Sequence, residues 1–117
     1  MNARQLLTAL RDSIGSAYPA RVAELSRHTG QVAATIAPTR CEYETGVLCE
    51  PVPMQLLAEV TVVAGSHSEA GVLDLLDHVD QIAALIRAAG WVVAEWTPDS
   101  IEDQSAVVIT ATAQGEG

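Results

Sequence analysis

The sequence contains no lysine and no phenylalanine, only two cysteines, and no apolar run long enough to span a bilayer. Without lysine there is no Walker-type cation for a nucleotide phosphate, and a net charge of -9 argues against a nucleic-acid-binding surface. Two cysteines cannot build a disulfide framework, so we expect free thiols; a single disulfide between Cys41 and Cys49 is the alternative. The first residues lack the pattern of a secretion signal, so we expect a protein made in the cytoplasm without membrane contact.

The residues that are present indicate one aliphatic core and an uneven charge. Apolar residues make up 49% of the 117 positions, mostly as alanine, valine and leucine, which suits a single domain spanning residues 1–117. Up to Arg40, five arginines oppose Asp12 and Glu24, whereas from Cys41 onward thirteen acids oppose Arg87 alone. If these segments lie on opposite sides of the fold, copies would attract one another head to tail; a monomer with solvated charges fits equally well.

The first half of the chain predicts a helix followed by strands. Asn2 can cap a helix whose apolar residues recur at helical spacing and which ends at Gly15. A loop with one helical turn is expected over 16–30, and a strand over 31–37 that ends at the following proline. A polar hairpin strand then leads to a turn at Gly46.

The second half predicts a strand, a long helix and two more strands. Residues 54–62 alternate between apolar and polar side chains, as in a half-buried strand. A long helix follows, from a capping box formed by Ser66 and Glu69 to a terminating glycine, Gly90. The remaining expected elements are a strand over 91–96, a turn at 98–100, a strand over 105–113 and a frayed end.

This order of elements predicts an α+β fold. We expect a single, mostly antiparallel β-sheet with an N-terminal helix and one long helix packed on one face. The other face combines polar and apolar side chains and is expected to meet a partner; its members are Thr110, Thr112, Glu95, Leu57, Val93, Ala106 and Val108.

No group of residues indicates catalysis. The loop Gly65–Gly71 is similar to a phosphate-cradling turn at a helix start, but helix capping explains its serine and glutamate equally well. Asp74 and His78 lie one helical turn apart without a further metal ligand, and no serine or cysteine sits in a nucleophile turn. We therefore expect no enzyme and assign no catalytic, cofactor-binding or metal-binding residue.

The two tryptophans are the best candidates for large contact residues. By strand parity Trp91 and Trp96 fall on opposite faces, so one is expected in the core and the other at an interface; core packing of both is the alternative. The predicted contacts with other subunits or partners are Leu57, Glu59, Ser66, His67, Ser68, Trp91, Val93 and Trp96.

About half of the chain follows a layout known from one family of proteins. It consists of the strand 54–64, the loop Gly65–Gly71, the helix stretch 72–80, the segment Ala88-Ala89-Gly90-Trp91, the pair Thr97-Pro98 and the closing stretch 107–112. In this layout, more than in invariant residues, the chain resembles the tail terminator proteins of long-tailed (siphovirus-type) phages of high-GC actinobacteria, whose genomes would also suit a lysine-free, alanine-rich sequence.

The resemblance implies a structural virion protein of the tail and neck, assembled in the host cytoplasm. Such a subunit forms a ring, typically a homohexamer, that caps the tail tube, stops its polymerisation and joins the tail to the head-completion (stopper) proteins. DNA would pass through the lumen without sequence-specific binding, which an acidic lining would favour. The alternative is a small oligomeric ligand-binding regulatory domain that holds an anionic metabolite at Gly65–Gly71.

Overall fold

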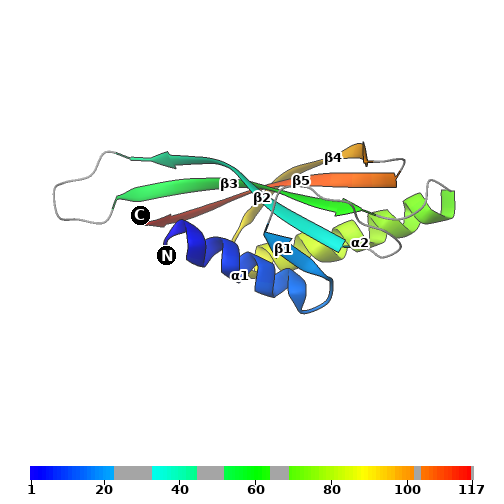
Figure 1. Ribbon diagram of the computed structural model, residues 1–117, viewed down its shortest axis with the longest axis horizontal. Coiled ribbons are helices and arrows are strands. Elements are labelled where there is room, and N and C mark those ends of the chain that lie inside the picture. Colours follow the sequence, from blue (N-terminus) through cyan, green and yellow to red (C-terminus); the bar gives the residue numbers. More distant parts are fainter. Residues whose placement is uncertain (23–32, 45–51, 64–68, 102–103, 117) are drawn as a thin grey trace.

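The computed structural model describes residues 1–22, 33–44, 52–63, 69–101 and 104–116. It contains the helices α1 (Ala3–Gly15) and α2 (Glu69–Ala88) and the strands β1 (Ala20–Val22), β2 (Ala33–Tyr43), β3 (Pro53–Val63), β4 (Val92–Ile101) and β5 (Gln104–Glu116). The strands form one sheet in the order β1-β2-β3-β5-β4, with both helices on the same side (Figure 1). Only β1 and β2 pair in parallel among the described strands, so the predicted α+β fold with a mostly antiparallel sheet is confirmed.

Helix α1 begins as its sequence predicts. The Asn2 side chain accepts a hydrogen bond from the Gln5 backbone N–H at 2.9 Å, and the Gln5 side chain accepts one from the Asn2 N–H at 2.9 Å. This reciprocal capping box satisfies two backbone donors that the first helical turn would otherwise leave unpaired. Leu6, Leu10 and Ile14 face the core, which fixes the helix on the sheet.

Helix α2 ends in a Schellman motif. The N–H of Trp91 donates to the carbonyl of Ile86 at 3.3 Å, and the N–H of Gly90 donates to that of Arg87 at 3.0 Å. Gly90 has a φ of 91°, a left-handed conformation that a residue with a Cβ adopts only at a cost. The motif turns the chain directly from the helix into β4. The predicted cap at Ser66 lies outside the described residues.

Replacing Gly90 with alanine tests this helix end. We expect the free energy of unfolding to fall by about 1–2 kcal/mol, the usual penalty for a side chain in the left-handed region. No heavy atom lies within 4 Å of the added Cβ, so the loss would come from backbone strain and not from a clash. Urea denaturation followed by circular dichroism would measure it, and an unchanged midpoint would contradict the assigned helix end.

The core lies between the two helices and the helix-facing side of the sheet. Each central strand contributes alternate aliphatic residues, and α2 adds a stripe at helical spacing. Trp91, only 2% exposed, joins this aliphatic cluster where α2 turns into β4. In the described part of the chain, no helix combines the length and apolarity needed to cross a membrane.

Two prolines lie inside strands where the sequence predicted an end or a turn. Pro38 lies in β2 and Pro98 in β4, so the expected strand end and the expected turn at 98–100 are wrong. Proline lacks a backbone N–H and is tolerated in strands at a sheet edge. Both prolines meet this condition, because β4 is an outer strand and β1 pairs only with Ala34–Ile36 of β2.

Two further segments differ from the prediction. Val22 belongs to β1 and not to a helical turn, while residues 23–32 are outside the described range. Residues 114–116, predicted to fray, belong to β5, where the N–H of Glu116 donates to the Met1 carbonyl at 2.8 Å. Cys41 is a free thiol whose Sγ lies 3.8 Å from Sδ of Met54; Cys49 and the turn predicted at Gly46 lie outside the described residues.

Candidate interaction surface

The open face of the sheet, opposite the helices, carries two of the predicted contact residues. Leu57 is half-buried and pairs with Arg40 of β2 and Thr112 of β5. Glu59, one step further along the open face, is exposed and pairs with Thr110. At the other end of this face the side chains are buried although neither described helix, α1 or α2, covers them; they are Ala33, Thr35, Thr61, Val63 and Ala106.

A β-bulge in β4 changes the predicted placement of the remaining candidates. Val93 pairs with Ala111, but the next paired residue is Glu95, opposite Thr110, so Ala94 is an extra residue. One extra residue reverses the alternation of side chains between the two faces. Val93 therefore packs against the core and not on the open face, whereas Glu95 stays on the open face as expected.

The same bulge overturns the parity argument for the tryptophans. Trp91 is buried in the core, and Trp96 pairs with Ile109, whose side chain also faces the helices. Both tryptophans thus lie on the helix side of the sheet, but Trp96 is 43% exposed because it lies on the outer strand. Ser66, His67 and Ser68 lie outside the described residues, as does most of the loop in which the ligand-binding alternative would hold its anion.

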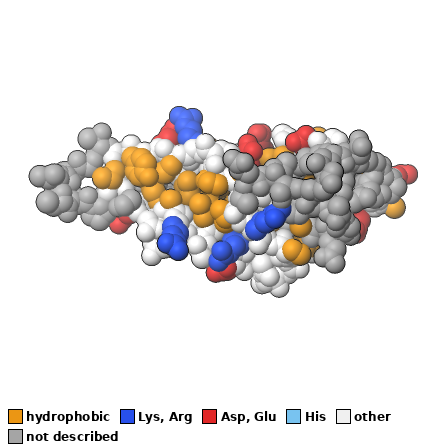
Figure 2. Space-filling view, in the orientation of Figure 1, with side chains coloured by type: hydrophobic (Ala, Val, Ile, Leu, Met, Phe, Trp, Pro, Cys, Tyr) orange, Lys and Arg blue, Asp and Glu red, His pale blue; other side chains and the backbone are white. Residues whose placement is uncertain are grey.

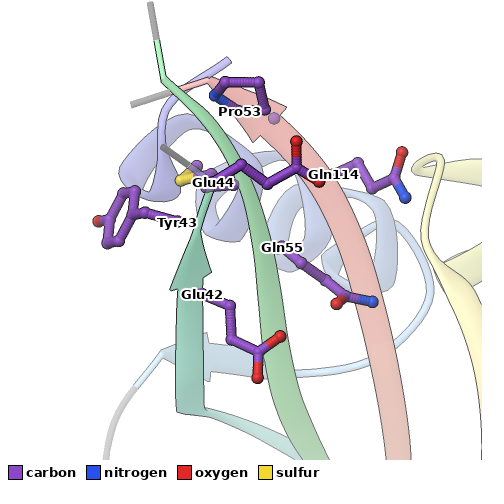
Figure 3. Close-up of a pocket in the computed structure, with 8 residues that line it drawn as sticks. Glu42, Tyr43, Glu44, Pro53, Gln55 and Gln114 are labelled. Atoms are coloured by element: carbon purple, nitrogen blue, oxygen red, sulfur yellow. The ribbon is translucent and has the colours of Figure 1, made fainter. Parts of the chain in front are cut away.

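A pocket of about 690 Å³ lies where β2 ends and β3 begins. Glu42, Gln55 and Gln114 lie side by side there on neighbouring strands, whereas the Tyr43 side chain points away from them (Figure 3). Glu42 already forms an ion pair with Arg40. No three histidine, cysteine or carboxylate side chains among the described residues could hold a metal ion. The lining can exchange hydrogen bonds but shows no nucleophile beside a base; it consists of Glu42, Tyr43, Glu44, Pro53, Met54, Gln55, Gln114 and Gly115.

A polar network joins the loop after α1 to the face of α2. The Tyr18 hydroxyl lies 2.8 Å from Nδ1 of His78 and donates to Oε1 of Gln81, and Nε2 of His78 lies 3.4 Å from Oδ2 of Asp74. The rings of Tyr18 and His78 meet edge to face with centroids 5.4 Å apart. The sequence pointed to Asp74 and His78 as a weak metal pair, but the structure uses them to hold Tyr18, which no local pattern identified.

Tyr18 should titrate above the ordinary range of tyrosine. Burial, with a smaller contribution from the Asp74 carboxylate, raises the pKa of the Tyr18 phenol. The folded state therefore keeps this proton when the unfolded chain has lost it, so the resulting stability is full below about pH 10 and is lost as the pH rises through the folded pKa.

The chain has two tyrosines, so the difference between the phenolate absorbance titrations of the wild type and of Tyr18→Phe isolates Tyr18. We expect its midpoint above about pH 10. A midpoint at or below that value would contradict the network.

The two lateral sides of the molecule carry opposite charge. Helix α1 contacts the outer strand β1 as well as β2 and β5, and α2 contacts the outer strand β4 as well as β3 and β5. Figure 2 shows arginine side chains around an apolar patch on the side of α1, β1 and β2. The described elements on this side carry Arg4, Arg11, Arg21 and Arg40 against Asp12 and Glu42. The elements α2 and β4 carry Glu69, Asp74, Asp77, Asp80, Glu95 and Asp99 against Arg87.

Comparisons with known proteins add little to this geometry. No family model and no curated protein matches the sequence. Among solved structures, the type 4 fimbrial biogenesis protein PilO from Pseudomonas aeruginosa matches with a TM-score of 0.41 and 14% identity, over 98% of this chain and 69% of that chain. A likeness of this degree carries no functional inference.

Proposed function

We propose that this protein is a ring-forming structural subunit of a phage tail, of the tail terminator class. In this role it caps the tail tube, stops its polymerisation and presents a surface to the head-completion proteins. The layout of strand, loop, long helix and closing strands in the second half of the sequence motivates the class. The observation that carries the proposal is the opposite charge of the two lateral sides of the sheet.

Opposite charge on two different sides favours head-to-tail contact between identical copies. A contact that joins two different patches is heterologous, and it closes into a ring when the rotation between copies is suitable. Contacts between like sides would bring acids against acids or arginines against arginines, which is unfavourable. The excess of acids is compatible with a lumen that lets DNA slide, because an acidic lining does not hold phosphates.

The mass of the protein in solution tests this proposal. Light scattering behind a sizing column would be run across a concentration series, alone and with the cognate tail-tube protein, at low and high salt. We expect a hexamer in at least one condition, weakened by salt because charged sides attract. A strict monomer or dimer in every condition would overturn the proposal.

A further inference from the structure

The outer strands β1 and β4 present matching patterns of side chains on their two faces. On β1, Arg21 pairs with Thr35 and therefore lies on the open face, whereas Val22 pairs with Ile36, a core residue, and lies on the helix side. Arg21 is exposed and Val22 is 38% exposed. This edge thus offers a cation on one face and an apolar side chain on the other.

Strand β4 offers the complementary pattern. Glu95 and Asp99 lie on the open face, since they pair with Thr110 and Ala106, and both are exposed. Trp96 lies on the helix side and is 43% exposed. The bulge at Ala94 creates this arrangement, because without it Trp96 would lie on the open face and Glu95 on the helix side.

The two patterns also lie at the same height along the strands. Val22 belongs to the row of paired residues that runs through Ile36, Val60 and Ile109 to Trp96. Arg21 belongs to the neighbouring row, which ends at Thr97, between Glu95 and Asp99 on the same face of β4. Two copies placed side by side, with their open faces on the same side, would align these groups.

We propose that the β4 edge of one copy docks on the β1 edge of a second copy of this chain. Trp96 packs on Val22, and the guanidinium of Arg21 lies between the carboxylates of Glu95 and Asp99. Strands β1 and β4 run in opposite directions within the sheet, so they are antiparallel where the two copies meet. This inference rests on the proposed ring-forming function and names its subunit interface.

Side chains, and not a continuous backbone ladder, carry the contact. Pro98 has no N–H to donate at the β4 edge, and the bulge at Ala94 interrupts the regular spacing of the remaining groups. An exposed tryptophan with a charged surround is a common anchor of protein interfaces. Assembly should therefore respond strongly to changes in a few side chains.

Charge reversal provides a test with a built-in rescue. The double variant Glu95→Arg/Asp99→Arg places arginines against Arg21, and the variant Arg21→Glu places acids against acids. We expect each variant alone to need a concentration about tenfold or more above that of the wild type to assemble, because like charges meet. An equimolar mixture should restore assembly, since every contact between the two variants pairs opposite charges.

Matched controls separate this contact from a general effect of charge. Asp77→Arg/Asp80→Arg makes the same change of net charge on exposed positions of α2, away from the β4 edge, and should weaken assembly much less than Glu95→Arg/Asp99→Arg does. Trp96→Ala should weaken assembly without altering the fold seen by circular dichroism. If the β4 variant forms rings as the wild type does, the edge contact is wrong while the ring-forming function stands.

A cross-link decides the contact even when the free protein does not form rings. In a background of Cys41→Ser and Cys49→Ser, Trp96→Cys protein is mixed with Val22→Cys protein and oxidised. Random pairing of the two variants would give a mixed dimer about twice as abundant as either homodimer, and the edge contact should raise the mixed dimer well above this ratio. The random ratio, or no dimer, would overturn the edge contact, whereas a wild type that stays monomeric with tail-tube protein overturns the proposed function.

Discussion

Replacing Trp91 with alanine is expected to lower the free energy of unfolding by about 3–5 kcal/mol. The side chain is 2% exposed and lies in the core cluster just after the glycine that ends α2. Its removal leaves a cavity at the junction of helix and sheet, where the Schellman motif limits how far the chain can collapse. Urea denaturation followed by far-ultraviolet circular dichroism would measure the loss.

Replacing Trp91 with phenylalanine should cost far less than replacing it with alanine. The indole N–H is buried and has no hydrogen-bond partner among the described residues, a situation that costs about 1–3 kcal/mol. Phenylalanine keeps most of the apolar volume and removes this donor, so the two effects offset each other and we expect stability within about 1 kcal/mol of the wild type. A loss as large as that of the alanine variant would mean that the N–H has a partner in the folded protein.

The elements that the sequence predicted correctly are those set by local chemistry. The cap at Asn2 and the helical spacing of leucines define α1, and the alternation of apolar and polar residues, broken at Leu57, defines β3. Gly90 marks the end of α2 because glycine, which has no Cβ, adopts the left-handed conformation of the helix end without a steric penalty. These signals lie within a few residues of the feature that they specify, so one sequence is enough to find them.

The elements that the sequence missed depend on distant partners. The three residues of β1 form a strand because they pair with β2, and nothing in their local sequence requires it. The bulge after Val93 has no sequence marker, and the one in β2 is marked only by Pro38, yet each reverses the faces of every residue that follows in its strand. The assignment of Trp91 and Trp96 to opposite faces failed for this reason alone.

The bulge in β4 also links the fold to the proposed assembly. It moves Trp96 to the helix side of the outer strand, level with Val22 of β1, and places Glu95 on the open face. The sequence suggested contacts in the loop before α2 and on the sheet face opposite the helices. The proposed contact instead uses the two outer strands of the sheet, β1 and β4. Only the pairing of strands reveals that the charged and apolar residues of these edges lie on matching faces.

Replacing Gly115 with alanine is expected to lower the free energy of unfolding by about 1–3 kcal/mol. Gly115 lies in β5 where the start of the chain crosses it, and an added Cβ would overlap the backbone carbonyl oxygen of Met1 and lie 2.9 Å from Cδ1 of Leu6. Relief of this overlap moves Met1 away and breaks the hydrogen bond between the Glu116 N–H and the Met1 carbonyl.

Gly15 provides the matched control for this change. It is the last residue of α1, and no heavy atom lies within 4 Å of the position that a Cβ would take. Gly15→Ala should therefore stabilise the protein by about 0.5–1 kcal/mol, since alanine loses less backbone entropy in a helix. Urea denaturation of both variants would show opposite shifts of the midpoint at an unchanged slope. A midpoint of Gly115→Ala at or above that of the wild type would mean that the first residues do not pack against β5.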